Sequence, residues 1–213
     1  MPSETAALFL ECGAVVRSVF DEPELAARWS EPSALAEMTI GSLAAHTARG
    51  VATVAQYIES PAEPLHPVET AVEYFHAALA LSDYGDGLDS EIQRGIRSRS
   101  EEEAREGSAA VAANLSAALA ALPGALEEPP ERLTVARGLS MRVDPYLETR
   151  IIEMVIHLDD LDHSLSATVG ACPDAATSLV AARVFELSEM RHGSMALIRA
   201  LSRPERAGDI SGF

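Results

Sequence analysis

"ETRIIEMVIHLDDLDHSL", residues 148–165, decides the fold, because apolar side chains occupy almost every side of the helix that it predicts. At about 100° per residue, Arg150, Glu153, His157 and Asp160 fall in one narrow stripe. Leucine, isoleucine, valine and methionine residues flank this stripe and close the back of the helix. An enclosed carboxylate or imidazole needs a hydrogen bond, an opposite charge or a metal ion. The stretch therefore predicts a packed helix with polar chemistry on its inner face.

The composition of the whole chain favours an all-α protein. Of the 213 residues, 47% are hydrophobic but only 5% are aromatic, and alternating β-branched runs are scarce. This length suits one domain spanning residues 1–213, with a substantial core. Four long amphipathic helices with connectors of moderate length suggest a bundle, in which metal and cofactor sites lie between facing helices.

The charge and the cysteines restrict partners and compartment. A formal charge of −17 argues against nucleic acid and anionic lipid, because both bind clustered basic residues. The acidic N-terminus lacks the basic region of a signal peptide, and no apolar run approaches the ~20 residues of a membrane span. Cys12 and Cys172 cannot form a disulfide framework. We therefore expect a soluble cytoplasmic protein.

Capping and turn residues divide the chain into helices. Ser3 and Thr39 are expected as N-caps of the first two, and Pro67 as the first residue of the third, which ends at the turn "SDYGDG". Asp144 is expected to cap the helix that contains the opening stretch. Residues 132–143 form an extended connector or a short hairpin. The expected helices cover residues 3–20, 40–59, 67–81, 88–122 (one helix, or two broken near Gly107), 145–165 and 174–201.

His46 is the strongest companion to the polar stripe. It points inward from its helix, and Gly50 leaves open space one turn later. Glu153 and His157 bring two ligands to one point, and a third from a facing helix leaves a position open to water or substrate, as in catalytic zinc sites. Two imidazoles and a carboxylate suit Zn²⁺, Ni²⁺ or Fe²⁺. On spacing alone, the alternative is a buried ion pair between Glu153 and either Arg150 or His157.

Other patterns in the sequence indicate less about function. "IRSRSEEEARE", residues 96–106, places Arg97 four residues before Glu101 and Arg99 four before Glu103, which predicts a solvated helix face. The chain has no G-x-S-x-G, P-loop or G-x-G-x-x-G motif, so serine hydrolysis and nucleotide chemistry have no support.

Two stretches carry a family resemblance: "WSEPSALAEMTIGSLAAHTARG" (29–50) and "YLETRIIEMVIHLDDL" (146–161). They combine Trp29, a Leu-x-x-Met-Thr-x-Gly approach to a helix, the His of that helix, and an R-x-x-E-x-x-x-H-x-x-D-L run. Together they resemble the N-terminal domain of mycothiol-dependent maleylpyruvate isomerases, one of the DinB-like metal-binding helical bundles. The resemblance covers residues 3–165 and leaves a helical C-terminal extension over 174–201.

The resemblance implies a four-helix bundle whose divalent metal, usually zinc, is held by His46, Glu153 and His157. Asp160 and Arg150 also match the run, and we expect them to orient a ligand or to neutralise charge at the site. Both are also our candidate catalytic residues.

The function that follows is metal-dependent activation of a small thiol such as mycothiol, for transfer to, or isomerisation of, an electrophile. The isomerases continue into an α/β domain, whereas only a helix and a tail follow residue 165, and thiol transfer needs only metal, thiol and acceptor. Arg49 and Tyr57, one to three turns from His46, are expected to contact the thiol's polar body. Alternatives are a hydrolase that activates water on the metal and a non-catalytic bundle that binds a small molecule or a partner helix; a homodimer is also open.

Overall fold

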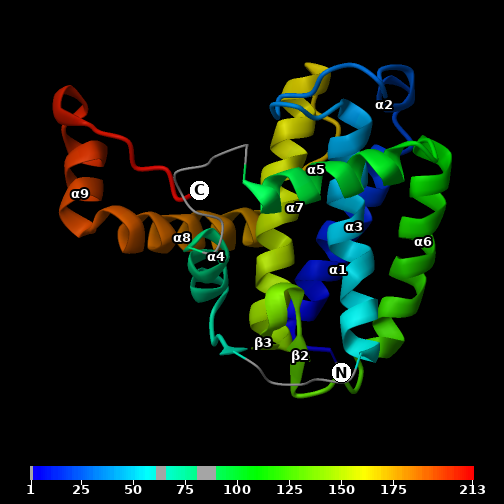
Figure 1. Cartoon of the computed structure of the whole chain (residues 1–213), viewed down its shortest axis with the longest axis horizontal. Coiled ribbons are helices and arrows are strands. Elements are labelled where there is room, and N and C mark those ends of the chain that lie inside the picture. Colours follow the sequence, from blue (N-terminus) through cyan, green and yellow to red (C-terminus); the bar gives the residue numbers. More distant parts are fainter. Residues whose placement is uncertain (1, 61–65, 81–89) are drawn as a thin grey trace.

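Four long helices form a closed bundle in a computed structural model of the chain, which describes residues 2–60, 66–80 and 90–213 (Figure 1). Helix α3 packs against α6 and α7, and α1 packs against the same two helices, so the four surround one core. The all-α bundle expected from the sequence is confirmed. The four helices are α1 (Glu4–Val19), α3 (Ile40–Glu59), α6 (Ser108–Ala125) and α7 (Val143–Leu165).

The first two long helices begin where their capping residues predict. The Ser3 hydroxyl accepts a hydrogen bond from the backbone N–H of Ala6 at 3.1 Å. The Thr39 hydroxyl accepts one from the backbone N–H of Ser42 at 3.0 Å. Each bond satisfies a donor that the first turn of a helix leaves without an intrahelical partner. The short helix α2 (Pro23–Ala27), between α1 and α3, was not expected from the sequence.

Trp29 fixes helix α5 (Glu91–Ala104) across one end of α3. Its indole N–H donates to the carbonyl of Ala104, the last residue of α5, at 2.9 Å. The same ring lies against Gly41 at the start of α3, where an added Cβ would come within 2.5 Å of the indole. The tryptophan and the glycine of the first motif therefore hold two helices together, and this contact brings α5 to the functional site.

Glycines interrupt two of the expected helices. Gly107 has a φ of 88° and separates α5 from α6, so the long stretch forms two helices, as one of the two expected arrangements has it. Gly193 has a φ of 82° and divides the expected helix 174–201 into α8 (Asp174–His192) and α9 (Ser194–Ser202). The expectation of one helix there is wrong, because this left-handed backbone conformation cannot continue an α-helix.

A small sheet changes the expected start of the third helix. The connector forms an antiparallel hairpin of β2 (Arg132–Thr134) and β3 (Leu139–Arg142), while β1 (His66–Pro67) pairs in parallel with β3. The helix predicted from Pro67 therefore begins later, as α4 (Ala71–Ala80), because the strand pairing takes its first residues. The turn predicted at residues 82–87 lies outside the described residues.

The start of α7 also differs from the prediction. The helix begins at Val143, with Arg142 at the N-cap position, and not after a cap by Asp144. The carboxylate of Asp144 instead accepts a hydrogen bond from the Ser3 hydroxyl at 2.6 Å. This contact ties the start of α7 to the start of α1, two helices that pack along each other.

Helix α6 is the one described helix that is long and apolar enough, by length and composition, to cross a membrane. The expectation that no such run exists was too strict, because alanines and leucines fill this helix without any charge. Since α6 packs along α3 and α1 in the bundle, its composition is weak evidence for a membrane span.

The C-terminal part leaves the bundle and then returns to it. Helix α8 extends away from α7, and α9 lies at the far end of α8 (Figure 1). The tail then folds back, with the Ser188 hydroxyl donating to the carbonyl of Ile210 at 2.6 Å. The ring of Phe213 meets that of Phe75 on α4 at a centroid distance of 5.2 Å. The last residue of the chain thereby reaches the cavity described next.

Candidate metal centre

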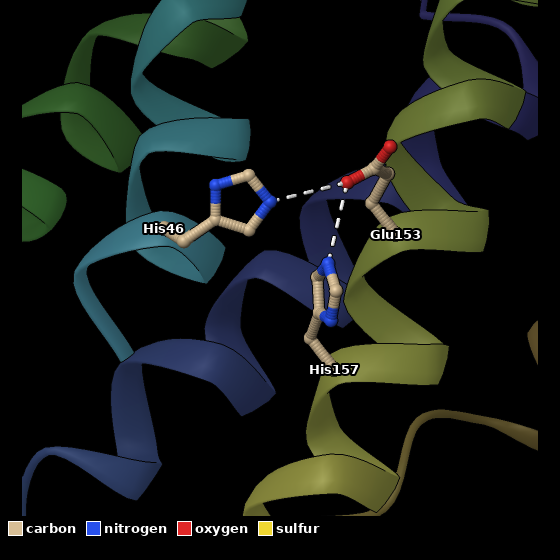
Figure 2. Close-up of side chains that lie close together, drawn as sticks. All are labelled: His46, Glu153 and His157. Carbon is tan, nitrogen blue, oxygen red and sulfur yellow. Dashed lines mark ion pairs between the residues drawn. The ribbon is translucent and has the colours of Figure 1, made fainter. Parts of the chain in front are cut away.

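Three side chains from two helices converge at the inner face of the bundle. Figure 2 shows His46 projecting from α3 toward Glu153 and His157 on α7. One oxygen of Glu153, Oε2, lies 3.6 Å from His46 Nε2 and 3.4 Å from His157 Nε2. One ligand atom from each of the three residues lies within 4.8 Å of the others. The structure thus brings together the three residues expected from the sequence.

The spacing of these atoms fits a divalent ion. Ligand atoms bound to zinc at about 2.0–2.1 Å in a tetrahedral arrangement lie roughly 3.3 Å from one another. The two Glu153–histidine distances, 3.6 and 3.4 Å, are close to this value. A charge-assisted hydrogen bond is shorter, at about 2.7–2.9 Å. The donor set of two imidazoles and one carboxylate also matches the preference of zinc and neighbouring metals.

A cavity of about 840 Å³ opens beside the three residues, between α3, α4, α5 and α7. Its size is in the range of sites for small molecules. Gly50 lies in its wall, and a Cβ added there would meet nothing within 4 Å, so the open space expected after His46 is present. The wall combines cationic and aromatic side chains, among them Arg49, Arg99, Arg150, Tyr57, Tyr74 and Phe213.

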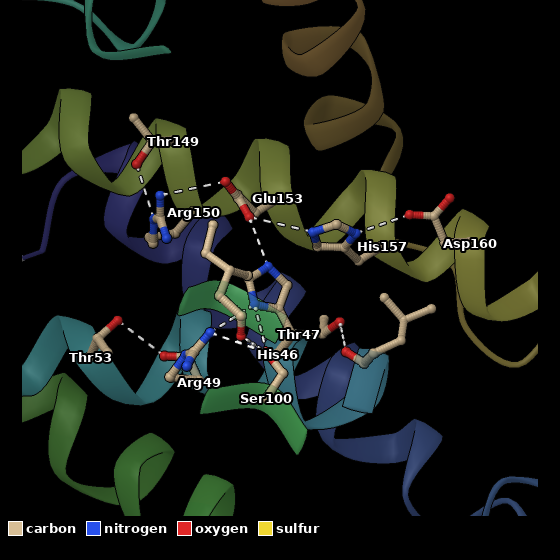
Figure 3. Close-up of polar contacts among 12 residues, drawn as sticks. His46, Thr47, Arg49, Thr53, Ser100, Thr149, Arg150, Glu153, His157 and Asp160 are labelled. Carbon is tan, nitrogen blue, oxygen red and sulfur yellow. Dashed lines mark hydrogen bonds and ion pairs between the residues drawn. The ribbon is translucent and has the colours of Figure 1, made fainter. Parts of the chain in front are cut away.

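His157 is oriented by a carboxylate on its own helix. Its Nδ1 lies 2.9 Å from Asp160 Oδ2 (Figure 3). A carboxylate can only accept, so Nδ1 carries a proton and Nε2 is the nitrogen that faces Glu153. Burial alone would lower the pKa of His157, but its hydrogen bond to Asp160 and its contact with Glu153 outweigh burial and raise the pKa to about 9.

His46 has different neighbours. Arg49, one turn later on α3, places Nη2 at 2.9 Å from His46 Nδ1. The hydroxyl of Ser100 on α5 lies 3.5 Å from the same nitrogen, and Glu103 lies 3.6 Å from Arg49 Nη1. Burial lowers the pKa of His46, and this exceeds the opposing effect of Glu153. His46 is therefore a neutral imidazole, and because arginine can only donate, its Nδ1 accepts.

Arg150 balances the charge of Glu153. Its Nη2 lies 3.8 Å from Glu153 Oε1, and its guanidinium stacks 5.2 Å from the ring centroid of Tyr146 and 5.9 Å from that of Tyr74. Burial would raise the pKa of Glu153, but the contacts of its carboxylate with His157 and His46 and the charge of Arg150 hold the pKa well below its usual range. Glu153 is thus an ionised carboxylate at neutral pH.

The two residues expected to contact the thiol lie at the cavity. Arg49 and Tyr57 both line the cavity, and the Tyr57 ring meets that of Tyr146 edge-on at 5.6 Å. Sequence reasoning did not find Ser100 or the two tyrosines that stack on Arg150. The spacing of Tyr146, one turn before Arg150, could have indicated it. Ser100 gave no such indication, since its partner lies on another helix.

The charged stretch before Gly107 agrees with its prediction only in part. Arg97 pairs with Glu37 at 2.9 Å and Glu103 with Arg49 at 3.6 Å, whereas Arg105 pairs with Glu101, four residues before it, at 2.9 Å on the exposed side. One face of α5 is therefore directed at α3 and the loop before it, whereas the opposite face is solvated as expected. Ser100, on the face toward α3, is fully buried.

Comparison with protein families agrees with this architecture. The model of the mycothiol maleylpyruvate isomerase N-terminal domain matches residues 10–162, about three quarters of the chain. The chain belongs to this family. The match contains both motifs and all three converging residues, and it ends before α8. Neither the curated proteins nor the solved structures gave a match. Members of this family are DinB-like bundles associated with metal and mycothiol, which agrees with the triad found here.

Proposed function

We propose that this protein is a metal-dependent enzyme that activates a low-molecular-weight thiol, such as mycothiol, for reaction with a small electrophile. The observation that carries the proposal is the convergence of His46, Glu153 and His157 at the wall of a cavity large enough for a thiol and its acceptor. Membership of the mycothiol maleylpyruvate isomerase N-terminal domain family supports the thiol as the ligand. Zinc is the expected metal, with nickel and iron as alternatives.

Three protein ligands would leave one coordination position facing the cavity. A divalent ion held by His46, Glu153 and His157 would supply the positive charge that favours ionisation of a thiol at neutral pH. Sulfur is also a softer ligand than water, which favours the thiol at that position. The acceptor would be bound in the rest of the cavity.

The side chains around the triad have distinct parts in this proposal. Asp160 holds the imidazole of His157 so that Nε2 faces the site, and Arg150 keeps Glu153 ionised and in place. Tyr57 lines the cavity, and burial raises its pKa, so its hydroxyl stays protonated and can bond to the polar body of the thiol. Arg49 lies across the same wall and can contact that body as well.

The proposed reaction forms a bond between the sulfur of the thiol and a carbon of the acceptor. The thiol loses its proton, its sulfur forms a bond to an electrophilic carbon, and the proton either joins the neighbouring atom of the acceptor or departs with the leaving group. An isomerisation of a double bond would reverse this addition after rotation about the carbon–carbon bond that the addition had made single. Because such small thiols are kept reduced in the cytoplasm, we also place the protein there.

A cobalt-substituted protein tests the proposal. Mycothiol, bacillithiol or a simpler thiol would be added, and the absorption spectrum would be recorded. We expect mycothiol to produce a new sulfur-to-metal charge-transfer band, and cysteine to act weakly because it lacks the polar body. An unchanged spectrum with every thiol, together with turnover of an ester or amide in their absence, would replace this proposal with hydrolysis by metal-activated water.

A further inference from the structure

The two histidines of the triad differ at Nδ1, which donates a hydrogen bond in His157 and accepts one in His46. A neutral imidazole has one N–H, and a metal binds the nitrogen that lacks it. Coordination through Nε2 therefore needs the proton on Nδ1. His157 already carries a proton on Nδ1, since that nitrogen faces the Asp160 carboxylate at 2.9 Å, so metal binding has to remove only the proton on its Nε2. His46 carries no proton on Nδ1, because that nitrogen accepts a hydrogen bond from Arg49 at 2.9 Å. Its proton is therefore on Nε2.

This arrangement of His46 conflicts with its use as a metal ligand. With the proton on Nδ1, that nitrogen and Arg49 Nη2 would be two donors facing each other at the present 2.9 Å. A buried N–H without an acceptor destabilises the site by the full desolvation penalty of the group. The Arg49 guanidinium must therefore move away, and Nδ1 must find an acceptor, before His46 can bind a metal through Nε2.

Ser100 is placed to be that acceptor. Its hydroxyl oxygen lies 3.5 Å from His46 Nδ1 and 3.4 Å from Arg49 Nη2. The hydroxyl already donates to the carbonyl of Ile96 at 2.8 Å, so its lone pairs remain available to accept. The side chain is fully buried, where no solvent competes for the bond. A small approach of the two residues turns the 3.5 Å contact into a hydrogen bond.

The side chain of Arg49 can also move to a second partner, Glu103. Its Nη1 lies 3.6 Å from Glu103 on α5, and that nitrogen has no hydrogen-bond partner at present. Movement toward Glu103 would shorten this ion pair and supply the missing bond. It would also take a positive charge away from the incoming cation. The change would therefore give Arg49 Nη1 the partner that it lacks at present, and would leave His46 Nδ1 with a hydrogen bond throughout.

We propose that metal loading transfers the His46 Nδ1 hydrogen bond from Arg49 to Ser100, while Arg49 moves to Glu103. Ser100 is thus a positioning residue for the metal, and Arg49 competes with it. This inference rests on the metal centre of the proposed function but not on thiol chemistry. It predicts opposite effects for two residues that touch the same nitrogen.

The test measures Zn²⁺ affinity, by competition with a chelator, for Ser100→Ala and Arg49→Met. We expect Ser100→Ala to lower the affinity about 10–100-fold, which is typical when a partner that orients a histidine ligand is removed. Arg49→Met should raise it about tenfold. Thr47→Val is the control for the first variant, because Thr47 is also buried and its hydroxyl also bonds to the carbonyl four residues earlier. Arg99→Met is the control for the second, since it removes a charge from the same cavity.

A spectroscopic readout tests the change of proton position directly. Long-range ¹H–¹⁵N NMR correlations distinguish the two tautomers of a histidine. We expect His46 to carry its proton on Nε2 in chelated protein and on Nδ1 after zinc is added. Unchanged affinity in Ser100→Ala, weaker binding in Arg49→Met, or an unprotonated Nδ1 in the loaded protein would each overturn the inference. A wild-type protein that binds no zinc would overturn the metal centre itself, which is a different result.

Discussion

The two histidines of the candidate metal centre have opposite surroundings. His157 lies on the same helix as both its acidic partners, Asp160 and Glu153, and these raise its pKa to about 9. His46 lies on α3 beside a cation, Arg49, and burial lowers its pKa. In one half of the site, residues close in sequence therefore already orient the histidine. The other half depends on how α3 and α5 pack, and we expect it to rearrange when a metal binds.

The largest effect should come from the carboxylate that the two halves share. Glu153→Gln keeps the shape of the side chain but replaces an anionic ligand with a weak neutral one, and it leaves Arg150 without its partner. We expect Zn²⁺ affinity to fall about 1,000-fold. Glu148→Gln is the control, because Glu148 lies on the same helix but pairs with Arg183. Equal affinities of the two variants would exclude Glu153 as a ligand.

The pH dependence of stability in chelated protein should have opposite signs for the two histidines. His157 has a folded pKa of about 9 against its ordinary 6.5, so its contribution is complete below pH 6.5 and is lost as the pH rises through about 9. The loss should reach up to about 3 kcal/mol. His46, whose pKa is lowered, should instead reduce stability as the pH falls below 6.5.

Urea unfolding at a series of pH values measures both effects. In His157→Gln the decline between pH 6.5 and 9 should disappear, and in His46→Gln the decline below pH 6.5 should become smaller. A decline above pH 6.5 that persists in His157→Gln would show that another group causes it, and the description of His157 as the acid-paired histidine would then be wrong.

Binding of a metal ion should link His46 on α3 to Glu153 and His157 on α7 and stabilise the fold. At a free zinc concentration about 100 times the Kd, binding to the native state alone contributes about 2.7 kcal/mol. For a chain of this size we expect a rise in melting temperature of about 5–10 °C. Chelation should reverse the shift without unfolding the bundle, because the apolar core is independent of the site. Calorimetry that finds the same melting temperature with and without zinc would contradict a buried site.

The smallest effect concerns the residue that orients His157. Asp160→Ala should lower Zn²⁺ affinity about 10–100-fold, because the imidazole loses the acceptor that fixes its tautomer. The loss should be at least that of Ser100→Ala, since the 2.9 Å bond to Asp160 is already formed whereas the Ser100 contact is 3.5 Å. Asp159→Ala changes an exposed neighbour and should leave affinity unaltered. A larger loss of Zn²⁺ affinity in Ser100→Ala than in Asp160→Ala would contradict the view that His157 is the better oriented of the two histidines.

The same contrast explains how much could be predicted from the sequence. Glu153, His157 and Asp160 share one face of one helix, so their angular positions on α7 predict the cluster. His46 could be added because its helix also shows which side points inward. The partners Ser100 and Glu103 could not be predicted, since they depend on the register between α3 and α5.

The fold follows the same rule. Local features such as the Ser3 and Thr39 caps and the break at Gly107 predict helix boundaries well. Long-range contacts override the rest: Pro67 pairs with β3 and does not open a helix, and Asp144 bonds to Ser3 on α1. The contact of Trp29 with Gly41, which sets the position of α5, lies within the motif but cannot be derived from its letters.

Elemental analysis of the purified protein tests the central claim most directly. The wild type, His157→Ala and His163→Ala would be loaded with zinc, dialysed and measured for metal per chain, and circular dichroism would verify folding. His163 is exposed on the same helix and serves as the control. We predict about one zinc ion per chain in the wild type and in His163→Ala, and none in folded His157→Ala. A folded wild type that retains no divalent metal, or an unchanged zinc content in His157→Ala, would contradict the metal centre.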